Sequence, residues 1–396
     1  MIRSSATQQE NYFRLLILAH ANRSAGARSV GINLLRALTR INNGIEVIAV
    51  LPVGYDYEEI GEIFSAPPIW FDQKGSFLRR LIFDTITLPR KVRSIKPDVI
   101  LALGNIGLRG HSIPQAILVQ DAHHVYPRRH YGRMTLSQHL RYFVQKRQIE
   151  HYLKKTSILY CQTKTMLKHT QNTFGIHRHA KILSKGISAS VFEGLDNTDA
   201  PQEFKPFEER FRLICLTRYN PHKNLEAIVD MFINAREVLQ DVVVFITIDA
   251  EQHPNAKRLL DKIHRYDLSN HIVNLGSVQQ RRIPAYFKNC HALLLPTLLE
   301  SFSATYLEAM QLDLPILTSN LDFAHETCGP AALYFDPWST QSILEAVVEI
   351  RKNTDLRNRL TIAGRDRLKT VYTKSWDQIA RSVASDLREL AHGRKE

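Results

Sequence analysis

The sequence of 396 residues contains few cysteines. The four that it has, Cys161, Cys215, Cys290 and Cys328, stand far apart, so no CxxC pair exists that could hold zinc or exchange disulfides. A disulfide-rich scaffold is therefore excluded. We expect reduced, mostly buried thiols, as is usual for a cytosolic protein of this length.

Long hydrophobic runs are also missing. The longest, such as 15–19 and 292–296, fall far below the roughly 20 residues that a membrane-spanning helix needs. Residues 1–11 are polar and lack the apolar core of a signal peptide. We therefore expect a chain without a transmembrane helix, although it can still lie on a membrane surface.

Acidic side chains are scarce only in the first half. Residues 1–200 hold 27 Lys and Arg against 14 Asp and Glu, whereas residues 201–396 hold 25 of each. A basic half is typical of a protein that binds nucleic acid, an anionic membrane or an acidic substrate. The chain has no helix-turn-helix signature, zinc spacing or RNP-like aromatic sequence, which disfavours nucleic acid.

Short apolar strands alternate with amphipathic segments, a pattern typical of α/β domains with parallel sheets. Residues 194–210 are polar and contain proline, which predicts a linker. We therefore predict two Rossmann-like domains, residues 1–200 and 208–372, with a helix at about 376–391 that can pack back on the first. Ligands of such sheets bind beyond the carboxyl ends of the strands, so the strand-to-helix loops should carry the function.

The segment PTLLESFSATYLEAM, residues 296–310, combines an expected helix start with two glutamates. Ser301 and Ser303 can cap that helix, and its first amides would attract a phosphate, because orphan N–H groups and the helix dipole both favour negative charge. Glu300 and Glu308 can accept hydrogen bonds from vicinal hydroxyls. A phosphate flanked by diols describes a nucleotide-sugar. The alternative is a solvated helix with two unrelated glutamates.

A second loop, LTRYNPHKN at 216–224, also follows an apolar strand and precedes a helix. Its cations Arg218 and Lys223 suit a diphosphate leaving group, since arginine binds phosphate through two parallel hydrogen bonds and lysine supplies a point charge. A pair of surface cations is the alternative. We expect this loop and the two glutamates at the same edge of one sheet.

These two motifs are similar to those of the nucleotide-binding domain of family 4 glycosyltransferases, which are retaining enzymes of GT-B fold. The resemblance rests on Arg218 and Lys223 in a post-strand loop and on the E-x7-E pattern of Glu300 and Glu308. Further similar tracts, which extend the resemblance over nearly the whole chain, are 16–38, 180–188 and 314–339, the last with Glu326 and the FDP segment at 335–337.

The resemblance implies two Rossmann-like domains facing each other across a cleft, with a nucleoside-diphosphate sugar held by the second. That sugar nucleotide would be a substrate, and neither a cofactor nor a metal would be needed. The implied roles are diphosphate binding by Arg218 and Lys223, sugar binding by Glu300, ribose binding by Glu308, phosphate contacts by the amides of Ser303, Ala304 and Thr305, and close backbone approach at Gly26 in the N-terminal loop.

The chain departs from the family at positions where glycine is common. Thr217, Ser301 and Ser303 stand there instead, and a serine side chain could restrict the approach of backbone to phosphate. Because serine is small and a good cap, we expect the function to be kept. A degenerate, non-catalytic binder is the alternative.

The acceptor side is expected after the strand at 115–119, where the family commonly has a histidine. In this chain Gln120 and Asp121 take that place, and His123 and His124 follow. We predict that His123 orients the acceptor hydroxyl, with His124 or Asp121 as alternatives. The two histidines could also be part of an exposed basic loop. His20, at another strand end, is expected to have a positioning role only.

Two basic amphipathic stretches, 76–96 and 128–155, have two interpretations. They are either helices packed on the sheet with solvated basic faces, or surfaces that dock on an anionic bilayer with apolar residues partly inserted. Docking would present a lipid-linked acceptor to the first domain.

The sequence therefore predicts a cytoplasmic hexosyltransferase that can lie on the inner face of a membrane. It would move a sugar with retention to a saccharide or lipid-linked saccharide acceptor in cell-envelope polysaccharide biosynthesis. A non-catalytic nucleotide-sugar-binding protein and a GT-B-shaped isomerase remain as alternatives.

Overall fold

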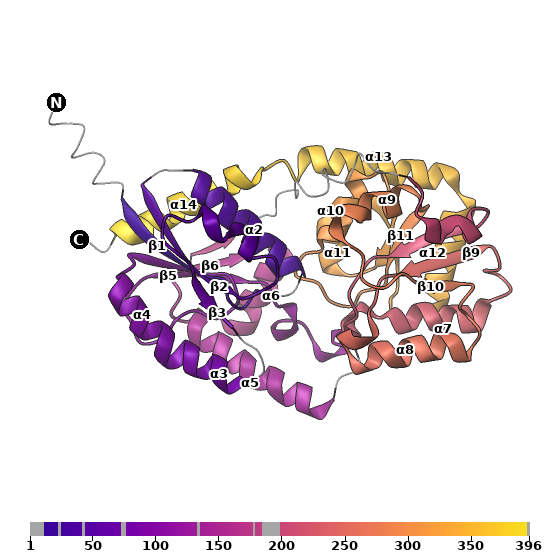
Figure 1. Cartoon of the computed structure of the whole chain (residues 1–396). Helices are drawn as coiled ribbons and strands as arrows, with labels where there is room; N and C mark the ends of the chain where they lie inside the picture. Colours follow the sequence, from indigo (N-terminus) through magenta and orange to yellow (C-terminus); the bar gives the residue numbers. More distant parts are fainter. Residues whose placement is uncertain are drawn as a thin grey trace. The chain divides into compact units, whose positions relative to one another are not determined.

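The structure, a computed structural model of the chain, describes residues 12–22, 25–41, 44–72, 77–132, 135–176, 179–183 and 199–393. The chain divides into two units (Figure 1). The first unit comprises Met1–Val125, Leu140–Gly186 and Lys374–Glu396, and the second comprises Tyr126–His139 and Ile187–Thr373. Residues 1–11, part of the predicted linker and the end of the 180–188 tract lie outside the described residues.

The first unit is built on a seven-stranded parallel sheet with the order β3-β2-β1-β4-β5-β6-β7. Its strands are β1 (Phe13–Leu18), β2 (Ile45–Pro52), β3 (Ile69–Phe71), β4 (Val99–Ala102), β5 (Gln115–Val119), β6 (Ile158–Cys161) and β7 (Ala180–Ile182). Its α-helices are α2 (Ala25–Arg40), α3 (Phe77–Ile82), α4 (Leu88–Ile95), α5 (Leu136–Leu153, whose first turn is grouped with the second unit), α6 (Lys164–Phe174) and α14 (Trp376–His392).

The second unit is built on a six-stranded parallel sheet with the order β10-β9-β8-β11-β12-β13. Its strands are β8 (Phe211–Cys215), β9 (Val242–Ile246), β10 (Ile272–Asn274), β11 (Ala292–Leu295), β12 (Ile316–Ser319) and β13 (Ala332–Phe335). Its helices are α7 (Leu225–Ala235), α8 (Pro254–Arg265), α9 (Ile283–Lys288), α10 (Ala304–Gln311), α11 (Asp322–Cys328), α12 (Thr340–Lys352) and α13 (Thr354–Thr370). In Figure 1, α7 and α8 run along one side of this sheet, and α9 and α10 lie on the other.

The central strands are short apolar runs because helices cover both faces of each sheet, which leaves no solvated side for polar residues. All five residues of β9 are buried, and so are all five of β5, including Gln115. Helix α14 packs against α2 and adds Ile379, Val383 and Leu387 to the core of the first unit. The chain end therefore completes the hydrophobic core of the domain in which the chain starts.

The described structure differs from the predicted domain boundaries in two places. Tyr126–His139 groups with the second unit although it lies inside the predicted 1–200 domain, because its aromatic side chains pack there, as described below. The predicted linker is partly folded: Gln202–Phe207 forms a 3-10 turn in which Phe204 is buried and stacks on Phe245 at 4.0 Å. Phe207 of the same turn packs against Phe245 as well, at 5.7 Å, so aromatic side chains anchor this polar stretch.

Two smaller differences concern the first unit. Helix α2 begins at Ala25, so Gly26 lies in its first turn and not in the predicted loop, since the Ala-Gly-Ala run continues as helix. Strand β3 is only three residues long and was not predicted. Among the described residues, no helix is both long and apolar enough to cross a bilayer.

Candidate functional site

The strand order of the second sheet reverses between β8 and β11, which are hydrogen-bonded neighbours. From β8 the chain winds outward through β9 to β10, and from β11 it winds the other way through β12 to β13. Open parallel sheets bind ligands at such a point, because the two loops that leave it diverge and open a crevice. The loops here are 216–224 and 296–303, which carry both predicted donor motifs.

Lys223 and Glu300 meet at this point. The Lys223 Nζ donates a hydrogen bond to Glu300 Oε1, and only 19% and 12% of the two side chains remain exposed. The Thr297 hydroxyl donates to the same carboxylate oxygen at 3.4 Å. Because both charged side chains are mostly withdrawn from water, the contact fixes them in position far better than a surface ion pair would.

Backbone contacts hold the two loops together. The carbonyl of His222 accepts hydrogen bonds from the Leu298 N–H at 2.8 Å and from the Thr297 hydroxyl at 3.3 Å. Asn224 adopts a left-handed conformation with φ of +56° and donates from its amide to the Pro337 carbonyl at 2.8 Å. Asn224 is also the N-cap residue of α7, so the helix begins directly after this turn.

Arg218 lies in the same loop and its side chain is exposed. The next residue, Tyr219, is buried, its N–H donates a hydrogen bond to Gln252 Oε1 at 2.8 Å, and its ring stacks on His253 at 5.5 Å. The loop that follows β9 therefore holds the residue next to Arg218 in place. The guanidinium is presented to solvent at the carboxyl edge of the sheet.

Helix α10 starts in the second loop. Ser303 occupies its N-cap position with extended backbone dihedrals and is buried, yet its side chain makes no capping hydrogen bond. The expectation that this serine caps the helix is therefore wrong, because its backbone reaches the cap position while its hydroxyl does not bond to a first-turn amide. Ala304 and Thr305 form that first turn, and Glu308 follows one turn later, half-buried.

The predicted acceptor residue, His123, lies in the first unit beyond the carboxyl end of β5. Its Nδ1 is 2.7 Å from Asp121 Oδ1, and His124 Nε2 is 3.2 Å from Asp121 Oδ2. Burial raises the pKa of Asp121, but hydrogen bonds with the two imidazoles and their charges outweigh it and hold that pKa well below its ordinary value. His123 also stacks on Tyr142 at 4.9 Å, so its ring is held on two sides.

A second imidazole–carboxylate contact in the first unit escaped the sequence reasoning. His20, beyond the end of β1, is buried, and its Nε2 lies 2.9 Å from Asp84 Oδ1. Arg80 donates to the other oxygen of Asp84 at 3.1 Å. Burial raises the pKa of Asp84, and the contacts with His20 and Arg80 lower it to below the ordinary value. Asp84 is the single acid in the basic stretch 76–96, which is the signal that could have singled it out.

Tyr126 and Asp322 were also missed. They belong to the second unit, and the Tyr126 hydroxyl donates to Asp322 Oδ1 at 2.9 Å. No spacing in the sequence connects residues so far apart. The only local signal was the aromatic and basic run YPRRHYG at 126–132, which stood out only as part of a longer basic stretch.

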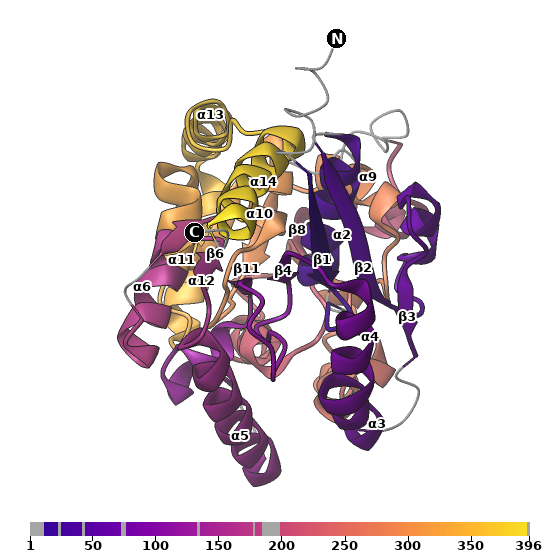
Figure 2. The ribbon, with the colours of Figure 1, turned by 90° about the vertical axis from the view of Figure 1, so that its left-hand side faces the viewer.

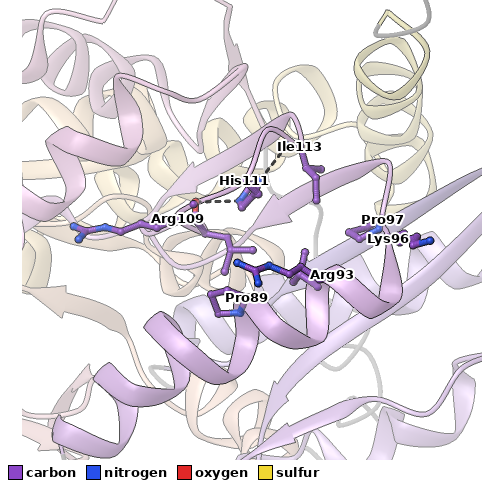
Figure 3. Close-up of a pocket in the computed structure, with 10 residues that line it drawn as sticks. Pro89, Arg93, Lys96, Pro97, Arg109, His111 and Ile113 are labelled. Atoms are coloured by element: carbon purple, nitrogen blue, oxygen red, sulfur yellow. Dashed lines mark hydrogen bonds between the residues drawn. The ribbon is translucent and has the colours of Figure 1, made fainter.

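A cavity of about 260 Å³ lies elsewhere in the first unit, between α4 and the loop before β5 (Figure 3). It is at the amino ends of the strands, the edge opposite to the one where open parallel sheets bind ligands. Arg109 and Lys96 extend toward opposite ends of it, and His111 is engaged by the Leu108 carbonyl and the Ile113 N–H. Its cations do not converge on one point, so we assign no reaction chemistry to it.

Comparison with known proteins finds a family that most of the second unit resembles. The sequence model described as glycosyl transferases group 1 matches residues 196–367. Over these residues the second unit is similar to the group 1 glycosyltransferases. The matched range contains both loops of the β8–β11 crevice, with Lys223, Glu300 and Glu308.

Two curated relatives extend the similarity over most of the chain. The alpha-monoglucosyldiacylglycerol synthase of Acholeplasma laidlawii is 22% identical over 376 residues, covering 88% of this chain and 91% of that protein. The O-antigen chain mannosyltransferase RfbU of Salmonella typhimurium is 24% identical over 344 residues, covering 84% of this chain and 89% of the mannosyltransferase. Each of these similarities extends well beyond the length that the family model matches.

A solved structure with the same fold is Anabaena HepE in complex with UDP and glucose. It has a TM-score of 0.70 and 14% identity, and the match covers 95% of this chain and 99% of that one. Together with the two parallel sheets, this likeness identifies the fold as GT-B, with two Rossmann-like domains. At this level of identity, the likeness supports the fold alone.

Proposed function

We propose that the protein is a family 4 glycosyltransferase that moves a hexose from a nucleoside-diphosphate sugar to a saccharide or lipid-linked saccharide, with retention at the anomeric carbon. The observation that carries this proposal is the contact between Lys223 and Glu300 at the β8–β11 crevice. It joins a cation suited to a leaving diphosphate and a carboxylate suited to sugar hydroxyls in one partly buried site.

The donor would be bound by residues of the second unit. Arg218 and Lys223 would neutralise the diphosphate and stabilise the charge that develops as it leaves. A lysine ammonium has three N–H donors, so Lys223 can stay on Glu300 and still reach a phosphate oxygen. The amides of Ser303, Ala304 and Thr305, whose helix start is not capped by the Ser303 hydroxyl, would take a second phosphate contact.

The carboxylates would hold the neutral parts of the same donor. Glu300, oriented by Lys223 and Thr297, would accept hydrogen bonds from the transferred sugar. Glu308 would accept them from the ribose. Since the protein's own cations and the helix amides neutralise the diphosphate, we propose that the reaction needs no divalent metal.

The acceptor would be activated from the first unit. With Nδ1 of His123 engaged by Asp121, the other ring nitrogen, Nε2, is the one suited to orient an acceptor hydroxyl or take its proton. Gly26, at the start of α2, meets no other atom within 4 Å of an added Cβ, so its surroundings leave room for a substrate group.

The names of the relatives support a lipid or envelope acceptor. One curated relative is named as a glycolipid synthase and the other as an O-antigen mannosyltransferase, and HepE was solved with UDP. We therefore propose that this chain works in cell-envelope polysaccharide or glycolipid synthesis, on the cytoplasmic side of a membrane.

Helix α5 offers a surface for that membrane. Leu136, Leu140, Phe143 and Val144 are all more than half exposed and recur at helical spacing on one face. The exposed cations Arg141, Lys146 and Arg147 lie among them. Figure 2 shows the lower end of α5 standing clear of the first sheet. Farther along the same helix Ile149 and Leu153 are buried in the first unit, so they do not belong to this exposed face. An apolar stripe flanked by cations suits an anionic bilayer.

The test is a panel of UDP-, GDP- and ADP-sugars. A bound donor must raise the melting temperature of the wild type, because a ligand that binds the folded state stabilises it. With acceptor present and EDTA added, NMR of the product should show a retained anomeric configuration. A donor that binds without turnover would indicate a non-catalytic binder, and a new sugar nucleotide formed without acceptor would indicate an isomerase. Absence of any binding would refute the proposal.

A further inference from the structure

Residues 126–132, which we call the crossing segment, come from the first half of the sequence yet belong to the second unit. They begin two residues after His124 and include a 3-10 turn at Arg128–His130. Three of its side chains are buried, namely Tyr126, His130 and Tyr131. The segment is therefore packed into the protein and does not form a solvent-exposed loop. Its contacts reach loops at the carboxyl edge of the second sheet.

The first contact is with the start of α11, the helix that follows β12. The ring of Tyr126 packs edge-on against Phe323 at 6.4 Å, and its hydroxyl donates to Asp322 Oδ1 at 2.9 Å. The same carboxylate oxygen accepts the N–H of Phe323 at 2.8 Å. Burial raises the pKa of Tyr126 far above its ordinary value, and the charge of Asp322 and then those of Glu326 and Glu300 raise it further. The phenol therefore stays protonated and can serve as the donor to Asp322.

The second contact is with the turn that carries Lys223. Gly132 has a φ of +70°, and a Cβ added to it would lie 2.3 Å from the Pro221 carbonyl oxygen and 3.0 Å from the His222 nitrogen. The backbone of the crossing segment thus packs directly against the backbone of the turn that carries Lys223. His222 is also the residue whose carbonyl holds Leu298 and Thr297 of the Glu300 loop.

The third contact is with the loop after β13. His130 packs edge-on against Trp338 at 5.4 Å, and the Arg129 guanidinium lies over the same indole at 5.5 Å. The crossing segment therefore touches the segments that directly follow β8, β12 and β13, and these strands lie on both sides of β11, which leads to Glu300.

We propose that the crossing segment is an integral wall of the donor site and that Tyr126 is a positioning residue for the donor sugar. By holding Asp322 it fixes the start of α11, which follows β12, the strand next to the one that leads to Glu300. A wall that is held in place before the donor arrives lowers the ordering cost of binding. This inference rests on the proposed function and adds a sugar-side determinant that comes from the first half of the chain.

The location of Tyr126 predicts a split between two probes. Its hydroxyl holds Asp322 at the start of α11, which follows β12, the neighbour of the strand β11 that leads to Glu300. Glu300 would hold the sugar, whereas the diphosphate would be held by Arg218 and Lys223. Tyr126→Phe should therefore weaken binding of the sugar nucleotide and leave binding of the bare nucleoside diphosphate unchanged. A general loosening of the unit would weaken both.

The experiment measures dissociation constants by calorimetry on the full chain, with UDP-glucose against UDP and GDP-mannose against GDP. For the pair that the wild type binds, we expect Tyr126→Phe to raise the constant of the sugar nucleotide about five- to tenfold and that of the diphosphate less than twofold. The matched control is Tyr286→Phe, which removes a similar hydrogen bond to a carboxylate, Glu203 Oε1 at 3.0 Å, in the same unit. It should change neither constant by more than twofold.

A second arm tests the bond itself. If Tyr126 acts through Asp322, the double variant Tyr126→Phe with Asp322→Asn should bind the sugar nucleotide no more weakly than the single variant that has the higher dissociation constant. Equal weakening toward both probes, or no weakening at all, would overturn the inference while leaving the proposed function standing. If the wild type binds neither a sugar nucleotide nor a diphosphate, the proposed function itself fails.

Discussion

The two sheets repeat one strand order, yet different chemistry stands at their carboxyl edges. In the second unit the reversal point holds an ammonium against a carboxylate, Lys223 and Glu300. In the first unit the corresponding edge holds imidazoles against carboxylates, in the pairs His20–Asp84 and His123–Asp121. The ammonium–carboxylate pair of the second unit suits a leaving diphosphate, whereas the imidazole–carboxylate pairs of the first unit suit proton transfer. The topology fixes where the side chains stand, and the loop residues decide what they do.

The largest expected effect tests the donor half of this comparison. Replacing Lys223 with Ala, or Glu300 with Gln, should lower kcat/KM for sugar transfer about 10²–10³-fold, because each removes a group that meets charge or hydroxyls in the transition state. The measurement is steady-state transfer from the donor identified in the panel. Lys262→Ala is the matched control, since Lys262 forms an ion pair with Asp230 in the same unit. A loss of similar size in that control would point to general damage.

Alanine substitutions at two glycines with positive φ allow the packing of the two units to be compared. Gly132→Ala should lower the free energy of unfolding by about 2–4 kcal/mol, because left-handed strain is joined by a clash with the Pro221 carbonyl. Gly175 ends α6 at φ of +66° with no atom within 4 Å of an added Cβ. Gly175→Ala should therefore cost only about 1 kcal/mol. Urea unfolding of both variants measures the difference, and equal costs would contradict the close contact at Gly132.

Acid should affect the two units in different pH ranges. Burial and the charges of Arg212 and Arg357 lower the pKa of His291 to about 4. The unfolded imidazole binds a proton near pH 6.5, so the stability that depends on neutral His291 is complete above that pH and is lost as the pH falls toward 4. We expect a loss of about 1–2 kcal/mol, allowing for screening of the partly exposed ring.

The carboxyl of Asp121 behaves in the opposite range. Because its pKa is lowered, its contribution to stability is present above pH ~4 and disappears only as the pH falls through that lowered value. Urea midpoints measured from pH 7.5 to 4 should therefore fall in the wild type and fall less in His291→Gln. Asp121→Asn should lower stability by a similar amount across that whole range. A wild-type slope that survives in His291→Gln would assign the titration to another group.

The smallest effects per residue concern the membrane. Leu140→Ser and Phe143→Ser should each weaken binding to vesicles rich in anionic lipid by about 1 kcal/mol, since each removes an apolar side chain from the proposed contact. Ile362→Ser is the control, because Ile362 is 57% exposed on α13 of the second unit. Cosedimentation at low and high salt provides the measurement. Equal losses in the control, or no vesicle binding at low salt, would reject docking through α5.

The sequence was sufficient to predict the second unit closely. Its strands are separate apolar runs, and the loops after β8 and β11 carry charged residues at spacings that local chemistry can interpret. The meeting of Lys223 with Glu300 followed from one rule, that parallel strands bring their carboxyl ends to the same edge. The missing Ser303 cap could not be foreseen, because it depends on the rotation of one hydroxyl.

The first unit was harder for a physical reason. Exposed Leu136 and Leu140 and buried Ile149 and Leu153 occupy one helix, so its apolar residues do not mark a single buried face. Likewise, Asp84 and His20 are 64 residues apart and meet only through the fold. The Tyr126–Asp322 bond spans 196 residues. Contacts of this kind leave no periodicity or spacing for sequence reasoning to use.

The crossing segment also limits how this protein can be taken apart. The chain changes unit after residues 125, 139, 186 and 373, so neither unit is a single continuous stretch. A fragment cut to the matched range 196–367 would leave Phe323 and Trp338 without the aromatic partners that Tyr126 and His130 provide. Chimeras that exchange donor specificity between relatives should therefore transplant both parts of the second unit, Tyr126–His139 together with Ile187–Thr373.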